Sequence, residues 1–188
     1  MTSSRKNKTL FIDKEASSAL ELVKDNLLYP ANSLMGKADS QEVLETGLIH
    51  GKTFPFPFIL APSGSRNKKV ILSLEVGEEL TILCEDEEFA ILVVDETFEI
   101  DPSQRIKHIY GTNDLAHPGV QATMKRLGSW AVSGEYRLLK KSSNKNTQKI
   151  QNAKKAIDAK HTTALFMAVN PLHRAHERLI RKTLDNTD

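Results

Sequence analysis

The chain has 188 residues, 39% hydrophobic and 27% charged, which is typical of a globular protein of one domain or one domain and part of another. A formal net charge of +2 gives no reason to expect a polyanion such as nucleic acid as a partner. No apolar run reaches the roughly 20 residues of a membrane-spanning helix, no signal-peptide core opens the chain, and the single cysteine, Cys84, excludes an intrachain disulfide, so we expect a cytoplasmic protein with no membrane partner.

Two helices are predicted near the start of the chain. Residues 15–28 have apolar side chains at helical spacing, with Leu20 and Val23 on one face, and Pro30 ends the pattern. A second helix is predicted in "SQEVLETG", with Ser40 as its N-cap and Gly47 as its C-cap.

The region from residue 48 to about 139 has the pattern of strands. We predict strands at 69–74, 79–84 and 88–100, and a final strand pair in "GSWAVSGEYRLLK". The run "FAILVV" is apolar on both faces, as in a central strand, and "SQRIKHIYG" predicts a short helix. Short strands at this spacing favour a compact β-barrel or sandwich.

The composition changes near residue 140. Residues 141–150 are polar and basic and are predicted to be a linker. A helix in "QKIQNAKKAIDA", a strand in "TALFMAV" and a helix in "PLHRAHERLIRKTLD" follow, and this order indicates a second domain of α/β type. One strand with its helix cannot bury both faces of the strand, so we expect the second domain to be incomplete.

The last strand-to-helix junction has the features of an anion site. Asn170 is predicted as the N-cap and Pro171 as the first helical residue, so free backbone N–H groups would face the strand's end. His173 and His176, three residues apart, would share one helix face and could donate hydrogen bonds to phosphate oxygens. Spacing alone does not separate this hypothesis from two ordinary polar residues at a helix start. A metal site is not expected, because two histidines without a third ligand bind metal poorly.

Several stretches resemble one known family. "NPLHRAHERLIR" is similar to the nucleotide-binding motif of the ATP sulfurylases (sulfate adenylyltransferases). "SLMGKADSQEVLETGLIHGKTFPFPFIL", "IYGTNDLAHPGV" and "GSWAVSGEYRLL" resemble further segments of that family, in the family's order. Together these stretches cover most of residues 28–184.

The resemblance implies both a fold and an activity. The fold is a mainly β, PUA-like barrel domain with flanking helices over 1–140, a linker over 141–150, and the truncated start of a Rossmann-like nucleotidyltransferase domain over 151–188. The activity transfers the adenylyl group of ATP, supplied with Mg, to sulfate, which gives adenylyl sulfate and pyrophosphate without a tightly bound cofactor. The partners implied are ATP, sulfate or another small anion, and further copies of the chain in a homo-oligomer. By position, Asn170, His173 and His176 would bind the ATP phosphates, and the two histidines would be the catalytic residues.

Two departures from the family limit this interpretation. The family's motif begins Gln-x-Arg-Asn-Pro, and its Gln and Arg hold sulfate, whereas this chain has Met167 and Val169 there. Neither side chain can donate to an oxyanion, so we expect sulfate binding to be badly weakened. The family's catalytic domain also continues well beyond residue 188, so the chain is expected to be impaired as a truncated gene product, a piece of a split protein or an engineered fragment.

Two other functions stay open at the level of sequence. One is a nucleotidyltransferase for another acceptor, and the other is a non-catalytic PUA-like binding module. Among the remaining candidates, His117 is expected to be a structural turn residue and Cys84 a buried hydrophobe. The acidic residues Asp95, Glu96 and Glu99 are expected to solubilise a strand edge rather than to bind metal.

Overall fold

The computed structural model describes residues 8–140 and 145–185. The chain divides into two compact units, 1–142 and 143–188. Within the described ranges, no helix is both long enough and apolar enough to cross a lipid bilayer.

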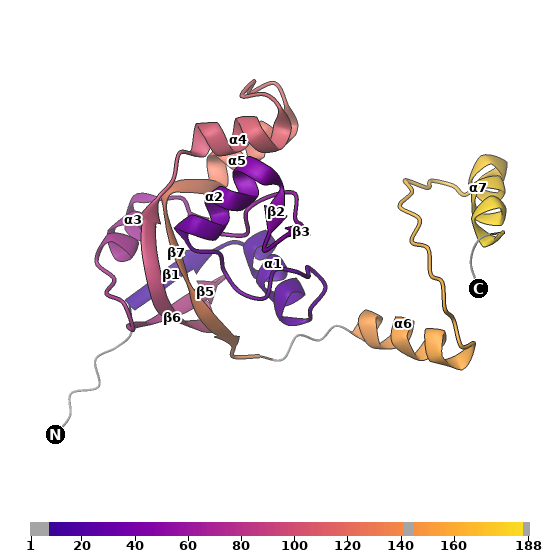
Figure 1. The fold of residues 1–188 in the computed structure, drawn as a ribbon, viewed down its shortest axis with the longest axis horizontal. Coiled ribbons are helices and arrows are strands. Elements are labelled where there is room, and N and C mark those ends of the chain that lie inside the picture. The colour runs from indigo at the N-terminus through magenta and orange to yellow at the C-terminus, as the bar shows by residue number, and fades with distance from the viewer. Residues whose placement is uncertain (1–7, 141–144, 186–188) are drawn as a thin grey trace. The chain divides into compact units, whose positions relative to one another are not determined.

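The first unit contains seven strands and five helices within the described residues (Figure 1). The strands are β1 (Lys8–Ile12), β2 (Leu48–Ile49), β3 (Lys52–Thr53), β4 (Leu60–Pro62), β5 (Glu79–Cys84), β6 (Glu87–Glu99) and β7 (Leu127–Leu138). The helices are α1 (Lys14–Lys24), α2 (Lys37–Thr46), α3 (Ser65–Leu72), α4 (Pro102–Tyr110) and α5 (Pro118–Arg126).

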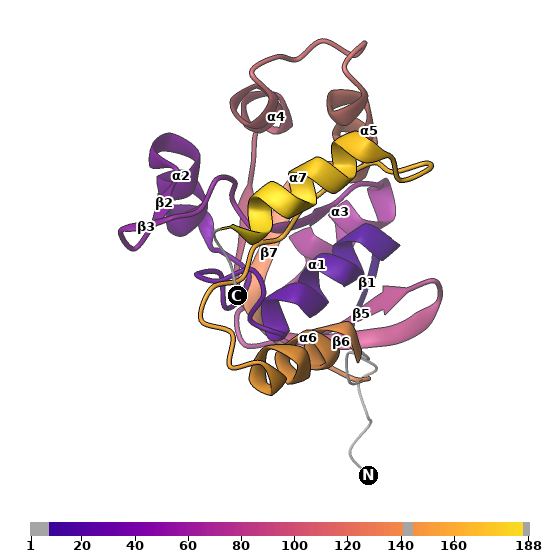
Figure 2. The ribbon, with the colours of Figure 1, turned by 90° about the vertical axis from the view of Figure 1, so that its right-hand side faces the viewer.

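Five of the strands form one curled sheet, a half-barrel with helices around it, in the order β1-β5-β6-β7-β4. β1 runs parallel to β5 and every other neighbouring pair is antiparallel. β6 is the central strand, as "FAILVV" predicted, but only one of its faces is buried: Ala90, Leu92 and Val94 are at most 1% exposed, whereas Val93 is 40% exposed. The remaining two strands, β2 and β3, form a small hairpin beside α2 (Figure 2).

A glycine makes the long pairing between β6 and β7 possible. The register shifts between Val94 and Glu96, and Gly134 sits at this irregularity with φ +152°. A Cβ on Gly134 would lie 1.9 Å from the carbonyl oxygen of Val93, so no other residue fits without displacing the backbone. Because β7 continues through this point, the predicted strand pair in 128–140 is wrong, and the segment is one strand.

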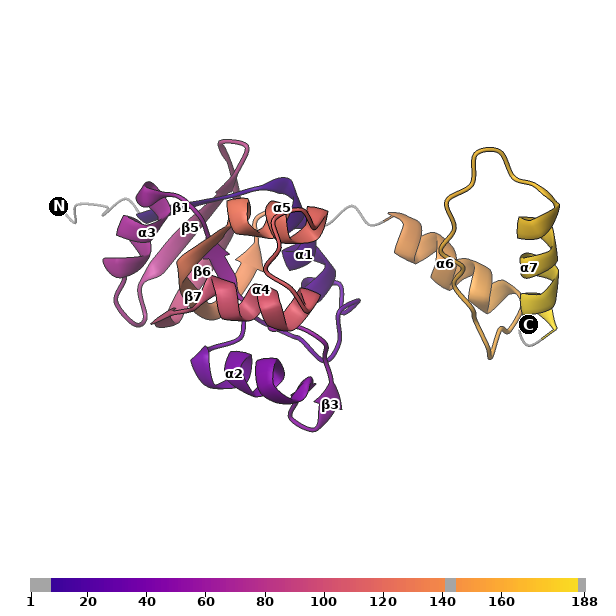
Figure 3. The ribbon, with the colours of Figure 1, turned by 90° about the horizontal axis from the view of Figure 1, so that it is seen from above.

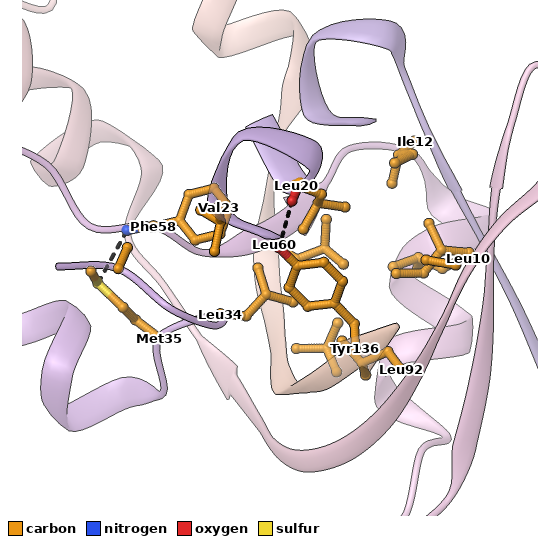
Figure 4. Close-up of a cluster of buried hydrophobic side chains, with 14 of the residues drawn as sticks. Leu10, Ile12, Leu20, Val23, Leu34, Met35, Phe58, Leu60, Leu92 and Tyr136 are labelled. Carbon is orange, nitrogen blue, oxygen red and sulfur yellow. Dashed lines mark hydrogen bonds between the residues drawn. The ribbon is translucent and has the colours of Figure 1, made fainter. Parts of the chain in front are cut away.

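The core fills the concave side of the sheet and includes polar groups that are satisfied. Leu10, Leu20 and Leu92 are at most 1% exposed (Figure 4). The Tyr136 hydroxyl donates a 2.8 Å hydrogen bond to the backbone oxygen of Leu20, and burial raises the pKa of this phenol. This bond joins β7 to α1 across 116 residues of sequence.

The predicted strand at 69–74 is wrong, because residues 69–72 form the end of α3 and Ser73 is its C-cap. "KVILSL" is a short apolar run, and periodicity alone cannot separate a strand from a helix in a run of this length. In the helix, Asn67 and Ile71 lie four residues apart on the buried face. The Asn67 side chain bonds the backbone N–H and C=O of Phe11, which attaches α3 to β1.

The first two predicted helices exist with different ends. α1 ends at Lys24, earlier than the predicted residue 28. α2 begins at Lys37 with Gly36 as its N-cap, so Ser40 is not the cap but lies in the helix and donates to the Lys37 backbone oxygen. Gly47 is the C-cap, in the left-handed conformation, as predicted.

The second unit contains two helices, α6 (Lys145–Ala156) and α7 (Arg174–Leu184), within its described residues. α6 begins inside the segment predicted as a linker, of which residues 141–144 lie outside the described ranges. The predicted strand in "TALFMAV" is not formed, and Phe166 is fully exposed. A strand needs a neighbour for its backbone hydrogen bonds, and residues 145–185 provide none.

Candidate functional site

The two candidate histidines meet at the start of α7. His173, not Asn170, is the N-cap: its Nδ1 accepts a 3.3 Å hydrogen bond from the Ala175 backbone N–H. His176, in the first turn, accepts a 3.4 Å bond from the His173 backbone N–H through its own Nδ1. These reciprocal bonds form a capping box, and the two ring centroids are 4.0 Å apart.

This arrangement fixes which ring atoms are free to bind a ligand. Since both Nδ1 atoms accept hydrogen bonds, each neutral ring carries its proton on Nε2. In the described part of the chain, neither Nε2 atom has a hydrogen-bond partner. The helix start therefore presents two adjacent N–H donors at its positive dipole end, a combination that suits phosphate oxygens.

The other predicted site residues lie outside any helix or strand. Asn170 precedes a cis peptide bond to Pro171, and both residues lie before the helix rather than in its first turn. Asn170 and Val169 are exposed and Met167 is half-buried. The helix starts three residues later than predicted because the His173–His176 capping box stops it there. The structure thus brings the two histidines together but gives Asn170 no hydrogen bond to either of them.

The stretch "GTNDLAHPGV" builds a helix start in the first unit. His117 is the N-cap of α5, where its Nδ1 accepts from the Val120 backbone N–H at 3.3 Å, and Pro118 is the first helical residue. The Tyr110 ring packs on His117, and a Cβ on Gly119 would lie 2.7 Å from that ring. His117 is therefore a capping residue that positions Tyr110, which agrees with its predicted structural role.

Of the acidic candidates, Glu96 has a structural contact. Glu96 accepts a 2.9 Å hydrogen bond from the Lys37 backbone N–H at the start of α2, where a carboxylate stabilises the helix dipole. Asp95 and Glu99 are exposed. Across residues 8–140 and 145–185, no group of three or more His, Cys, Asp or Glu side chains is placed to hold a metal ion. Cys84 is half-buried rather than fully buried, with Sγ 3.5 Å from the Ser17 hydroxyl.

Sequence reasoning missed a cluster of charges around Asp13. This carboxylate caps α1 by accepting from the Ala16 N–H at 2.8 Å, and it also accepts from Arg126 Nε at 2.5 Å and Nη2 at 2.8 Å. The Arg126 guanidinium is the largest influence holding the pKa of Asp13 below its usual value. The pair spans 113 residues of sequence, so no local pattern could have predicted it.

A family model matches the first unit, and curated relatives match most of the chain. Residues 1–141 match the family model described as a PUA-like domain. The sulfate adenylyltransferase of Symbiobacterium thermophilum is 31% identical over 186 residues, which cover 94% of this chain and 46% of that protein. Those of Psychrobacter arcticus and Cenarchaeum symbiosum are 31% and 25% identical, over 85% and 94% of this chain and 40% and 48% of the relatives. The chain thus spans about half the length of the curated relatives it matches.

One solved structure is similar to this fold. A hexameric APS kinase from Thiobacillus denitrificans aligns with a TM-score of 0.65 over 96% of this chain and 32% of that chain. At 17% sequence identity, this likeness shows the fold alone.

Proposed function

The chain belongs to the PUA-like domain family, and from this premise we propose that it is part of a sulfate adenylyltransferase-like protein in which α7 binds the phosphates of ATP. The similarity to sulfate adenylyltransferases carries the proposal. The family model ends at residue 141 of 188, whereas the similarity to the Symbiobacterium thermophilum protein covers 94% of the chain. The likeness therefore continues past the PUA-like domain into the second unit.

The proposed chemistry is transfer of an adenylyl group. A sulfate oxygen forms a bond to the α-phosphorus of ATP, the bond from that phosphorus to the bridging oxygen breaks, and pyrophosphate leaves. Mg would enter with ATP and would offset the charge of its phosphates. The Nε2–H groups of His173 and His176 donate to phosphate oxygens and stabilise the charge that develops on them. Asn170 contributes a further polar side chain beside the phosphates. No covalent intermediate with the protein is needed, since positioning and charge stabilisation supply the catalysis.

The residues at the expected sulfate-binding positions favour a second candidate function. Met167 and Val169 stand where the resembled family has the Gln and Arg that hold sulfate, and neither can form a charge-assisted hydrogen bond. This observation supports either weak use of sulfate or transfer to a less highly charged acceptor. We propose that sulfate is a poor substrate for this protein.

ATP binding tests the nucleotide half of the proposal. Binding of ATP with Mg is measured by isothermal titration for the chain and for His173→Asn and His176→Gln. Asn at an N-cap and Gln at the third helical position preserve the capping bonds, so each variant removes an imidazole donor without removing the helix start. We expect a loss of affinity of about tenfold for each, the value of one hydrogen bond to a charged group. Equal affinity in all three proteins would exclude phosphate binding by these rings.

The use of sulfate as the acceptor is tested by introducing the Gln and Arg of the resembled family. We expect little sulfate-dependent ATP–pyrophosphate exchange by the chain and increased sulfate affinity in Met167→Gln combined with Val169→Arg. The matched control is Ala168→Arg, which adds the same charge at the neighbouring position. Robust exchange by the unchanged chain would contradict our interpretation of Met167 and Val169.

A further inference from the structure

The first unit contains a cavity of about 640 Å³ that none of the proposed chemistry uses. It lies where β1 passes into α1, where β4 ends, and beside α4 and α5, which lie side by side (Figure 3). Its volume is within the range of sites that bind small organic molecules. Much of its wall is apolar, contributed by the side chains of Phe11, Phe56, Ile59, Leu60, Ile109 and Leu127.

Three cationic side chains border this cavity, and only one of them is paired with carboxylates in the described residues. The three are Arg105, Lys125 and Arg126. Arg126 is paired with Asp13, and its Nε lies 3.1 Å from a Glu15 carboxylate oxygen. Arg105 is half-buried, and its Nη2 donates a 2.7 Å hydrogen bond to the Pro57 backbone oxygen. Throughout the described residues, no carboxylate forms an ion pair with Arg105 or with Lys125 at the rim. The lining carries three cations and one carboxylate, Asp13, so it has an excess of positive charge.

The unpaired state of Arg105 is energetically unusual. Burial lowers the pKa of this guanidinium to about 10, so it remains protonated at neutral pH. A half-buried charge without a counter-ion costs free energy that a bound anion would recover. Guanidinium also has several N–H donors in one plane, of which the Pro57 contact uses one.

Two hydroxyl groups add to the polar part of the lining. The Tyr110 hydroxyl forms a 2.9 Å hydrogen bond with the Thr123 hydroxyl, and both residues line the cavity. Arg105 and Arg126 border the same cavity, so its wall offers an anion both guanidinium and hydroxyl donors.

A neighbouring cavity of about 230 Å³ does not share this character. Arg105 borders it as well, but its lining includes the carboxylates of Glu45, Glu99 and Asp101. Its three carboxylates outnumber the cations Lys37 and Arg105 in the lining, so it lacks the positive excess of the first cavity, and its volume is about a third as large. The larger cavity is the one suited to a negatively charged ligand.

We propose that the larger cavity binds a small organic anion, with an apolar body against Phe11 and Leu60 and a carboxylate or phosphate group on Arg105, assisted by Lys125. This site lies wholly in the PUA-like unit and involves neither His173 nor His176. It is therefore separate from the adenylyl-transfer function proposed above, and either proposal can fail alone.

The test uses the full chain and four probes followed by changes in backbone amide chemical shifts. The probes are phenyl phosphate and benzoate as anions with an apolar body, benzamide as the uncharged analogue, and inorganic phosphate as an anion without a body. We expect saturable binding of at least one aromatic anion, with shifts at residues lining the cavity, and weaker binding of the other two probes. The tighter of phenyl phosphate and benzoate identifies the preferred anionic group.

Substitutions distinguish binding in the cavity from nonspecific attraction of an anion to positive charge. Arg105→Gln is expected to weaken the aromatic anion about tenfold, and Lys125→Gln to weaken it severalfold. Lys107→Gln is the matched control, because it removes one positive charge from an exposed position of the same helix, outside the lining. Lys125→Gln keeps the test valid if Arg105→Gln fails to fold, since Lys125 is exposed. The proposal is overturned if no aromatic anion binds, if benzamide or inorganic phosphate binds equally well, or if the cavity variants behave like Lys107→Gln.

Discussion

Gly134 has a positive φ and lies against the backbone of Val93, and both features require a residue without a side chain. With φ +152° and a Cβ position only 1.9 Å from the Val93 oxygen, any substitution must separate β6 from β7. Gly134→Ala is therefore expected to lower the free energy of unfolding by about 3 kcal/mol or more, as overpacking and backbone strain add. Urea denaturation followed by circular dichroism measures the loss.

Gly47→Ala provides the comparison for this prediction. Gly47 also has positive φ, +68°, but open space surrounds its Cβ position. Its substitution costs only the strain of a left-handed residue, about 1–2 kcal/mol. A similar loss in both variants would show that the contact with Val93 has no effect of its own.

Residue patterns predicted local roles better than distant contacts. His117 before Pro118 and Gly119 could be recognised as a turn, because each residue type has its own backbone preference. The packing of the Tyr110 ring on His117 could not be predicted in this way. The same limit applies to Arg105, whose isolation from carboxylates becomes visible only once the chain is folded.

At the scale of elements, α7 depends on its two histidines for its first turn. The two Nδ1 contacts are long, at 3.3 and 3.4 Å, and every residue of the helix is at least partly exposed. His173→Ala is therefore expected to destabilise the helix start by at most about 1 kcal/mol, which is enough to reduce its population measurably. Cα chemical shifts across residues 174–184 report this change.

The variant His173→Asn gives the control for that measurement. Asparagine is a strong N-cap, so the helical shifts should persist although the imidazole is gone. If both variants show unchanged shifts, the capping box does not support α7. Helix content and ATP affinity together then separate the structural role of His173 from its proposed catalytic role.

Elements with strong periodicity or end signals were predicted correctly, and ambiguous runs were not. β5, β6 and α4 appear as predicted, because alternation, a long apolar run and helical spacing are distinctive. α3 and β1 were missed, since "KVILSL" fits two periods and β1 depends on a parallel partner 72 residues away, Lys8 with Leu80. The strand predicted in "TALFMAV" has the right composition but no neighbour in the described residues.

At the scale of the whole molecule, the expected PUA-like, mainly β fold is confirmed by the curled sheet and by the family match over residues 1–141. The division into PUA-like domain, linker and catalytic start stays a proposal, as does the nucleotide site. The sequence could indicate the phosphate-binding motif through resemblance. The cavity could not be predicted, because four separate segments form its wall.

The burial pattern predicts where the stability of the chain resides. All buried hydrophobic residues of the described chain lie between Leu10 and Tyr136, inside the first unit. A fragment of residues 1–142 is therefore expected to unfold within about 3 °C of the full chain, a difference that corresponds to about 1 kcal/mol. Scanning calorimetry of both proteins measures the midpoints. A much lower midpoint for the fragment would mean that the second unit stabilises the first.

The strand order has a consequence for synthesis on the ribosome. Within the described residues β4 pairs only with β7, and 72 further residues must be translated after Leu60 before its partner Val132 is present. At about 5–20 residues per second, the nascent chain carries an unpaired apolar strand for several seconds. The wall that β4 shares with α4 and α5 can close only after that delay. A chaperone that shields the emerging chain would thus be needed most in the interval between translation of β4 and release of β7.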